Sequence, residues 1–162
     1  MKESVFLENL ALYKDPIFRY CLSLLKNYHD AEDATQEIFI KLFQQNLEDE
    51  THIRNWLYRS SYNYCMSIFR TKWKAVILDD ELLAQLPDHQ QKQEMEILLQ
   101  CPKKYYSVLY LNYYEGFTQN EIASILGISL DVVKKRVLAG KRWLKEYLGK
   151  EAENEEKYLQ EL

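Results

Sequence analysis

The segment from residue 118 to residue 148 constrains the chain most, because its caps and apolar spacing predict two helices joined by a sharp turn. Thr118 and Glu121 have the spacing of a capping box, in which each side chain bonds a free backbone N–H. Gly127 predicts the end of the first helix, since glycine takes the left-handed C-cap conformation without steric cost. Ser129 is expected to cap the second helix. This pattern is typical of a helix-turn-helix.

The second helix of this pair is predicted to have a buried stripe and a basic face. The stripe recurs at helical spacing and comprises Val133, Val137, Gly140, Leu144 and either Tyr147 or Leu148. The basic face includes Lys134, Lys135 and Arg136. In a helix-turn-helix, this helix enters the major groove, where cationic side chains reach phosphates and guanine edges. A helical hairpin with a solvated basic face is the alternative.

Length and composition limit the remaining possibilities. A chain of 162 residues allows one domain or two small ones. With 47% hydrophobic residues, four glycines and three prolines, we expect a soluble, mostly helical protein. We expect no signal peptide and no membrane-spanning segment, and therefore a cytoplasmic location. The three cysteines lack any CxxC spacing, which favours buried thiols over disulfides or zinc ligands.

The net charge of -4 conceals an alternation of basic and acidic blocks. Residues 51–75 carry five basic residues and no acidic one, and residues 118–148 carry six basic residues against three acidic ones. Residues 1–50, 76–100 and 149–162 are each acidic. Local potential governs contact with phosphates over a Debye length of about 8–10 Å, so two separate DNA contacts are predicted.

Three N-terminal helices are expected. Asp15 and Pro16 have the order of an N-cap followed by proline at the first helical position, which predicts a helix start there. A second helix is predicted from Asp30, with Ala31, Ala34, Thr35, Ile38, Phe39 and Leu42 on its buried face. A polar loop is predicted over residues 46–52, and a third helix from Ile53 to Trp73. Residues 75–95 resemble a linker, another helix follows Pro102, and the acidic tail is expected to fray.

The third predicted helix mixes aromatic and basic residues. Trp56, Tyr58, Tyr62 and Tyr64 interleave with Arg54, Arg59 and Arg70. Aromatic faces can stack unpaired bases while cations follow the backbone. Leu57 and Tyr64 are interpreted as core residues, whereas Trp56, Arg59, Tyr62 and Asn63 are predicted to contact a single strand. Asn63 could also pair with an adenine edge.

Three motifs, in this order and spacing, resemble the extracytoplasmic-function sigma factors of bacterial RNA polymerase. They are DAEDATQEIFIKLF at 30–43, NWLYRSSYNYCMSIFR at 55–70 and YEGFTQNEIASILGISLDVVKKRVLAGKRWL at 114–144. The resemblance implies an all-α protein of two small helical domains joined by a flexible linker. The expected boundaries are 1–74 for core docking and minus-10 recognition, 75–95 for the linker, 96–148 for minus-35 recognition, and 149–162 for the tail. The family is not enzymatic, and no cofactor or metal is expected.

The resemblance assigns three surfaces. The docking face, expected to bind the coiled coil of the polymerase β′ subunit, comprises Asp30, Glu32, Asp33, Gln36 and Glu37. The minus-10 face comprises Trp56, Arg59, Ser60, Tyr62, Asn63, Ser67 and Arg70, and loop 46–52 is expected to capture a flipped base. The minus-35 face comprises Ser129, Asp131, Lys134, Lys135, Arg136, Leu138 and Arg142. The YYEG helix is expected to face the β flap, and an anti-sigma factor is the expected regulator.

Three positions depart from the family pattern. Ser67 stands where an acid or amide is common, and Ala139 with Gly140 replaces a small residue followed by arginine. Glycine inside a helix costs about 1 kcal/mol relative to alanine. No additional C-terminal sensing domain is expected.

Two other classes of function compete with the sigma factor. One is a stand-alone helix-turn-helix regulator whose N-terminal region senses a signal or dimerises. The other is an enzyme that holds a metal with Asp30, Glu32, Asp33 and Glu37. A di-iron bundle needs carboxylates on four helices with Glu-x-x-His pairs, which this chain lacks.

Overall fold

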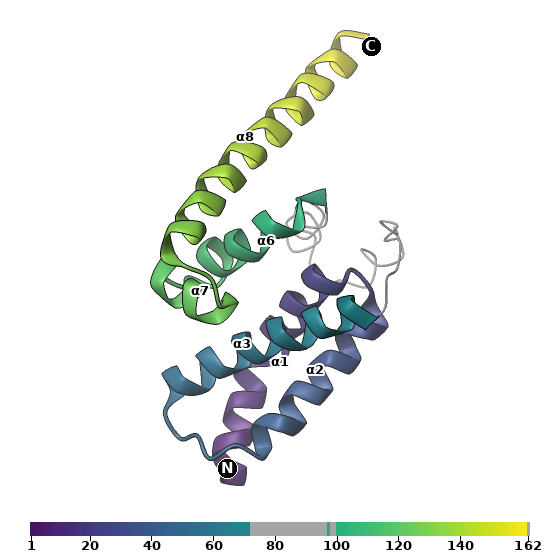
Figure 1. Ribbon diagram of the computed structural model, residues 1–162. Helices are drawn as coiled ribbons and strands as arrows, with labels where there is room; N and C mark the ends of the chain where they lie inside the picture. The colour runs from purple at the N-terminus through teal and green to yellow at the C-terminus, as the bar shows by residue number, and fades with distance from the viewer. Residues whose placement is uncertain (72–96, 98–99, 162) are drawn as a thin grey trace.

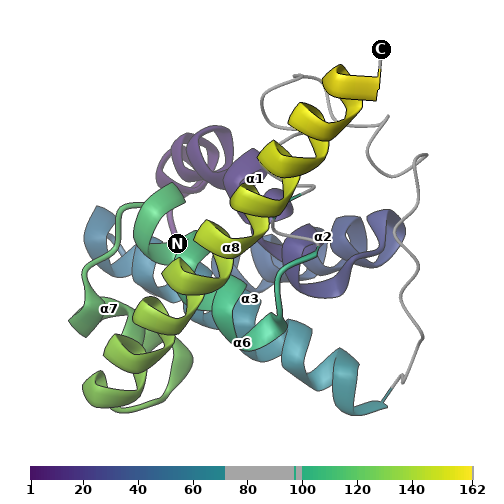
Figure 2. The ribbon, with the colours of Figure 1, turned by 90° about the horizontal axis from the view of Figure 1, so that it is seen from above.

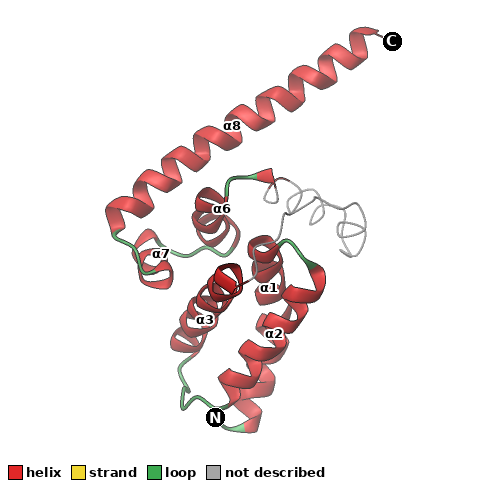
Figure 3. Cartoon of the chain, turned by 45° about the vertical axis from the view of Figure 1, so that its right-hand side comes forward, coloured by secondary structure: helices red, strands yellow, loops and turns green. Residues whose placement is uncertain are grey.

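The computed structural model describes residues 1–71, 97 and 100–161, and every element in this part of the chain is helical (Figure 3). The elements are α1 (Glu3–Leu25), α2 (Tyr28–Phe43), α3 (Glu50–Thr71), α6 (Lys103–Leu109), the π-helix η1 (Tyr110–Tyr114), α7 (Gln119–Leu126) and α8 (Leu130–Glu161). Helices α1 to α3 form an N-terminal bundle, and α6 to α8 form a second domain above it (Figure 1). The all-α prediction is confirmed. The predicted linker at 75–95 lies outside the described residues.

Helix α1 begins at Glu3 and runs through Pro16, so the predicted start at Pro16 is wrong. Proline in a helix interior lacks the N–H that would bond the carbonyl four residues earlier. The preceding turns are nevertheless held by packing, because the ring of Phe6 lies 5.1 Å from that of Phe43 and 6.5 Å from that of Phe39. Tertiary contact with α2 therefore outweighs the local signal.

The second and third helices begin two to three residues before their predicted starts. Asn27 caps α2, since its Oδ1 accepts a hydrogen bond of 2.9 Å from the backbone N–H of Asp30. Helix α3 begins at Glu50, where Asp49 Oδ1 accepts a bond of 3.0 Å from the N–H of His52. All six residues predicted for the inner face of α2 are buried: Ala31, Ala34, Thr35, Ile38, Phe39 and Leu42.

The helix-turn-helix forms as predicted. The hydroxyl of Thr118 accepts a bond of 3.2 Å from the N–H of Glu121, and the Glu121 carboxylate accepts one of 3.3 Å from the N–H of Thr118. Gly127 has a φ of 67° and ends α7 in the left-handed region. Ser129 Oγ then accepts a bond of 3.3 Å from the N–H of Val132, which starts α8. The predicted capping box, turn and second cap are all confirmed.

Gly140 has a packing role that explains its place inside a long helix. A Cβ atom there would lie 2.9 Å from Cδ1 and 3.0 Å from Cγ of Leu109, which are distances below normal contact. Leu109 is buried at the end of α6. Glycine therefore lets α8 cross α6 closely, which offsets the lower intrinsic helix propensity.

Helix α8 continues well beyond the predicted domain boundary at residue 148. The acidic tail, expected to fray, is helical to Glu161. This last part of α8 extends away from the body of the protein, as the side view and the view from above both show (Figures 1 and 2). Leu159 on this extension is exposed.

The two domains meet at a seam, formed by α1 and α3 on one side and by α6, η1 and α7 on the other. Tyr20 of α1 stacks on Tyr110 of η1 with ring centroids 5.3 Å apart. The hydroxyl of Tyr106 donates a hydrogen bond of 3.3 Å to the carbonyl oxygen of Leu24. Both domains therefore share buried side chains.

The three cysteines, Cys21, Cys65 and Cys101, are free thiols and all are buried, as predicted. Burial raises the pKa of Cys101 to about 12. These thiols act as small apolar groups in the core and at the seam.

Within the described residues, we find no helix with both the length and the apolar content needed to cross a bilayer.

Candidate nucleic-acid interface

Helix α8 separates its buried stripe from its basic face. Val133 and Val137 are buried, whereas Lys134 and Lys135 are exposed and Arg136 is half-exposed. Leu138, in the same row, is 63% exposed, which is unusual for a leucine. An apolar side chain among cations can contact a thymine methyl group in the major groove. The remaining members of the minus-35 face, Ser129, Asp131 and Arg142, are exposed as well.

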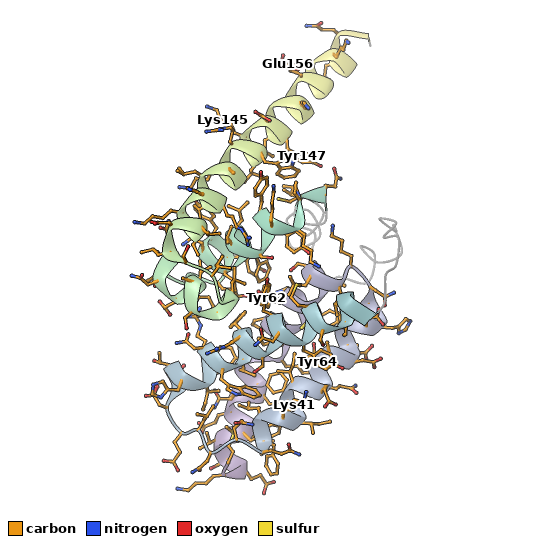
Figure 4. All side chains as sticks on the ribbon, in the orientation of Figure 1. Lys41, Tyr62, Tyr64, Lys145, Tyr147 and Glu156 are labelled. Carbon is orange, nitrogen blue, oxygen red and sulfur yellow. The ribbon has the colours of Figure 1, made fainter. Side chains whose placement is uncertain are left out.

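Further along α8, the outer face remains cationic and the inner face aromatic. Lys145 points away from the body while Tyr147 turns toward α6 (Figure 4). Tyr147 stacks on Trp143 with ring centroids 5.1 Å apart. Both rings belong to α8, and Trp143 packs against the buried core, so the inner face of this part of the helix is held while the cations stand on the outer face.

On α3, three members of the predicted minus-10 face form an exposed row. Arg59, Asn63 and Ser67 are exposed at intervals of four residues, and Trp56 and Ser60 beside them are half-buried. Ser67 Oγ donates a hydrogen bond of 2.7 Å to the carbonyl oxygen of Tyr64. The side chain of Arg70, another predicted member, lies outside the described part of the chain. The row has the aromatic, amide and cationic groups that a single strand requires.

Two tyrosines near this row have other surroundings. Tyr58, one of the interleaved aromatic residues, is fully buried, so it is not available to stack a base. Its ring lies 4.9 Å from that of Phe117, and burial next to the Glu115 carboxylate raises its pKa far above the usual range. Tyr62 lies at the seam between α3 and the second domain (Figure 4).

Tyr64 has the core role expected of it. It is half-buried where α2 and α3 pack, and the ammonium of Lys41 lies 5.1 Å from the centre of its ring (Figure 4). A ring held in this way helps to join the two helices and is poorly placed to stack a base.

A cleft of about 530 Å³ separates the minus-10 face from α7. Trp56 and Arg59 line it from α3, and Asn120, Glu121 and Ser124 line it from α7. Part of the predicted single-strand surface therefore faces the other domain. This cleft was not predicted from the sequence.

Arg54 joins the two domains beside this cleft. Its guanidinium donates a hydrogen bond through Nη2 to the carbonyl oxygen of Glu115. The same group lies over the ring of Phe117, with the guanidinium carbon 3.8 Å from the ring centroid. We call Arg54, Glu115 and Phe117 the latch. The latch was not predicted, because the hydrogen-bonded residues are 61 positions apart and carry no local signal.

Several buried polar atoms near the latch lack a hydrogen-bond partner, among them the Tyr20 hydroxyl and Oε1 of Glu115. A buried polar atom left unpaired costs about 1–3 kcal/mol. Burial also raises the pKa of Tyr20 well above its usual value. These buried polar groups make the seam less favourable than an entirely apolar contact of the same area would be.

The docking face is carried by the outer side of α2. Glu32, Asp33 and Gln36 are exposed, and Asp30 and Glu37 are half-exposed. The carboxylate of Glu37 lies 3.8 Å from the ammonium of Lys41. All five side chains project from one rigid helix, and among the described residues no group of three or more His, Cys, Asp and Glu is placed to hold a metal ion.

An apolar groove of about 1060 Å³ runs between α1 and α2 next to the docking face. Phe6 and Leu7 line it from α1, and Ile40 and Phe43 from α2. Leu7 and Ile40 are more than half exposed, and Phe43 nearly so. The groove was not predicted, because α1 was expected to begin at Pro16 and residues before it form one wall. Exposed apolar side chains beside carboxylates are typical of a surface that binds another protein.

Comparison with known families agrees with this arrangement. Residues 10–75 match the model of Sigma-70 region 2, and residues 93–144 match that of Sigma-70 region 4. Together the two matches cover more than half of the chain. The chain belongs to the extracytoplasmic-function sigma factors. It is therefore an RNA polymerase sigma factor that acts in transcription initiation, and the prediction from the three motifs is confirmed.

Several relatives resemble this sigma factor over most of its length. The ECF RNA polymerase sigma factor SigW of Bacillus subtilis is 28% identical, with 90% of each chain covered. The ECF RNA polymerase sigma factor SigE of Mycolicibacterium smegmatis is 30% identical, with 85% of this chain and 59% of that protein covered.

Solved structures share the fold. The sigma factor RpoE of Bartonella quintana, in complex with the anti-sigma factor NepR, has a TM-score of 0.72 at 21% identity, with 89% of this chain and 96% of that chain covered. CnrH, in complex with the cytosolic domain of CnrY, has a TM-score of 0.68 at 19% identity, with 91% and 90% covered. The match of residues 10–75 to a sigma region favours the sigma factor over a stand-alone regulator.

Proposed function

We propose that this sigma factor brings core RNA polymerase to promoters through three surfaces on two domains. Residues 1–74 form the domain for polymerase docking and minus-10 recognition, and residues 96–148 form the domain for minus-35 recognition. Residues 75–95 link them, and residues 149–162 extend α8 as an acidic appendage. The chemistry of RNA synthesis belongs to the polymerase, and we assign no catalytic residue, metal or cofactor to this chain.

The docking face on α2 is proposed to bind the β′ coiled coil. Exposed carboxylates and an amide on one helix can pair with arginines of a partner and set its orientation. The adjoining apolar groove supplies apolar surface that the partner can bury, while the charged residues at its rim fix the position of the partner along α2. Asp33 stands in the middle of the face and is exposed, so it is the residue to test.

The minus-10 face on α3 is proposed to hold the separated strand. Trp56 offers a ring for stacking, Asn63 offers an amide for a base edge, and Arg59 offers a charge for the backbone. Stacking on an aromatic ring contributes about 1–3 kcal/mol per base, which helps to offset the few kcal/mol lost when a base leaves the duplex. The loop before α3 is proposed to receive the flipped base.

The minus-35 face on α8 is proposed to enter the major groove of duplex DNA. Lys134, Lys135 and Arg136 follow directly on the capped first turn, where a recognition helix meets base edges. Arg142, two turns on, is suited to a phosphate contact. Leu138 is proposed to contact a thymine methyl group in the same groove.

Two protein partners complete the proposal. The YYEG segment at the end of η1 is proposed to face the β flap, because Tyr113 and Tyr114 expose apolar rings there. An anti-sigma factor is the proposed regulator, in line with the two similar structures, each of which pairs its protein with a second chain. We place the protein in the cytoplasm, where polymerase and DNA are found.

The observation that carries this proposal is that two separate exposed faces with basic residues, one on α3 and one on α8, lie on the two parts of the chain that match sigma regions. The test is to mix the protein with core polymerase and genomic DNA and to sequence the 5′ ends of the transcripts. We expect the starts to share two sequence elements at a fixed spacing. Starts indistinguishable from those of core polymerase alone would contradict the proposed function.

A further inference from the structure

The outer face of α8 carries exposed leucines, which we call the outer stripe. Leu138, Leu148 and Leu159 are 63%, 48% and 69% exposed. They follow one another at intervals of ten and eleven residues, close to three helical turns each, so they lie on one side of the helix. Leu138 is proposed to contact DNA, but Leu148 and Leu159 lie beyond the minus-35 face. Apolar side chains repeated in this way on a solvent-facing helix indicate a protein contact.

The charges beside the outer stripe change sign along the helix. Arg142 and Lys145 are exposed in the first half of α8, and Glu156 is exposed in the second half. Lys145 and Glu156 are eleven residues apart and lie on the same outer side of the helix (Figure 4). As a whole, residues 118–148 are basic and residues 149–162 are acidic. A helix with one basic and one acidic half is complementary to a second copy of itself in the antiparallel direction.

Gly149 marks the point where the charge changes sign. It is exposed within α8, and an added Cβ atom would meet nothing within 4 Å. Glycine is a poor helix former. In the described part of the chain, neither a left-handed φ nor a close contact like that between Gly140 and Leu109 accounts for Gly149. A glycine on a helix face allows a second backbone to approach closely, so the middle of the outer stripe is suited to a helix crossing.

We propose that the free chain forms an antiparallel homodimer through the outer stripe of α8, with its two-fold axis at Gly149. This axis places residues at equal distances on either side of Gly149 level with each other. Arg142 of one protomer, seven residues before Gly149, then lies opposite Glu156 of its partner, seven residues after it. Leu138 of one protomer lies beside Leu159 of its partner, at eleven and ten residues from the axis. Symmetry forms each pair twice, so a single substitution acts at two places.

Dimerisation has a consequence for promoter recognition, and this consequence rests on the proposed function of the minus-35 face. Leu138 and Arg142 belong to that face and are covered by the partner in the dimer. Duplex DNA and the second protomer therefore compete for one surface, so DNA binding shifts the equilibrium toward monomers. The docking face lies on α2, away from the outer stripe, and stays available to polymerase.

Sedimentation equilibrium of the full-length chain without polymerase tests the dimer. Over a wide range of protein concentration, we expect the average mass to rise from that of the monomer toward twice that value. Arg142→Glu and Glu156→Arg should each raise the Kd of the dimer about tenfold, because two attractive pairs become repulsive. The variant with both changes should recover affinity to within about threefold of the wild type, since the pairs form again with their charges exchanged.

Gly149→Gln tests the helix crossing itself. Glutamine is a better helix former than glycine, but its side chain would stand between the two helices at the axis. We expect this variant to remain folded and helical by circular dichroism while the Kd of its dimer rises about tenfold or more.

Lys150→Glu is the matched control for the charge reversals. It makes the same change of charge as Arg142→Glu, at another exposed position of α8. Lys150 lies about 120° around the helix from Glu156, outside the outer stripe. We therefore expect the Kd of the dimer to be the same for this variant and the wild type.

A wild-type chain that stays monomeric at every concentration would overturn the inference. So would a dimer whose Kd is unaffected by both single charge reversals and by Gly149→Gln. Transcription by core polymerase separates this failure from that of the proposed function. Promoter-specific initiation by a chain that never dimerises would mean that only the dimer is wrong. A dimer with the expected charge dependence that directs no such initiation would contradict the proposed function and leave the dimer standing.

Discussion

Gly140 of α8 faces the side chain of Leu109 in α6 so closely that an added Cβ would lie 2.9 Å from Cδ1. Alanine normally stabilises a helix by about 1 kcal/mol over glycine, but overpacking a core costs about 1–3 kcal/mol. We expect Gly140→Ala to lower the free energy of unfolding by about 1 kcal/mol, measured by urea denaturation. The double variant with Leu109→Ala should lose less than the sum of the two single changes. A stabilised Gly140→Ala protein would contradict the close crossing.

Reversing the charge of the minus-35 face should separate promoter recognition from docking. We expect Lys134→Glu with Arg136→Glu to abolish transcription from promoters that need the minus-35 element, because two phosphate-facing cations become repulsive. Binding to core polymerase should be unchanged, since the docking face lies on α2. Lys157→Glu, on the exposed extension of α8, is the control. Loss of both activities together would mean that the two residues serve the structure of the helix.

Removing the aromatic and amide groups of the minus-10 face should affect strand separation. We expect Trp56→Ala with Asn63→Ala to lower the yield of open complex about tenfold. A tenfold loss corresponds to about 1.4 kcal/mol, which is within the contribution of one base stacked on an aromatic ring. Closed-complex formation should change less, because it depends on duplex contacts. Permanganate footprinting of the promoter measures the opening. Normal permanganate reactivity with the double variant would show that α3 does not hold the separated strand.

Charge reversal on α2 should weaken association with the polymerase core. We expect Asp33→Arg to raise the Kd for core polymerase about tenfold or more, because a carboxylate proposed to meet arginines becomes a like charge. Glu153→Arg reverses an exposed carboxylate on the extension of α8 and serves as the control. Binding curves that coincide for Asp33→Arg and the wild type would show that the docking face lies elsewhere.

Lys103 at the seam links stability to pH. Burial lowers its pKa from 10.5 to about 8, aided by the nearby Lys26 and opposed by Cys65. The folded chain thus binds the proton of the Lys103 ammonium less tightly than the unfolded chain does. The free energy of unfolding therefore rises as the pH rises from about 8 toward 10.5. We expect the wild type to gain stability relative to Lys103→Met between pH 7.5 and about 9.5. Contributions from groups that do not interact with Lys103 cancel in this difference, and parallel pH curves would contradict the shift.

Features set by residues close in sequence could be predicted, and those set by the other domain could not. The capping box of Thr118 and Glu121 and the buried stripe through Val133 and Val137 depend on spacings of three or four residues. The burial of Tyr58 could not be predicted, because Phe117, which packs on its ring, is distant in sequence. The latch and the cleft were missed for the same reason.

The start of α1 was predicted wrongly for a different reason. Pro16 is a strong local signal for a helix boundary, but the apolar residues before it pack on α2 and extend the helix. That extension creates one wall of the apolar groove. The charged members of the docking face could be identified from sequence, whereas the groove beside them required the structure.

Association with polymerase tests the central claim most directly. Purified full-length protein and core RNA polymerase are mixed at equal concentrations and followed by analytical ultracentrifugation. We expect a one-to-one complex that is weakened by Asp33→Arg and retained by the variant with Lys134→Glu and Arg136→Glu. Independent sedimentation of the wild-type chain and the core enzyme would contradict the account.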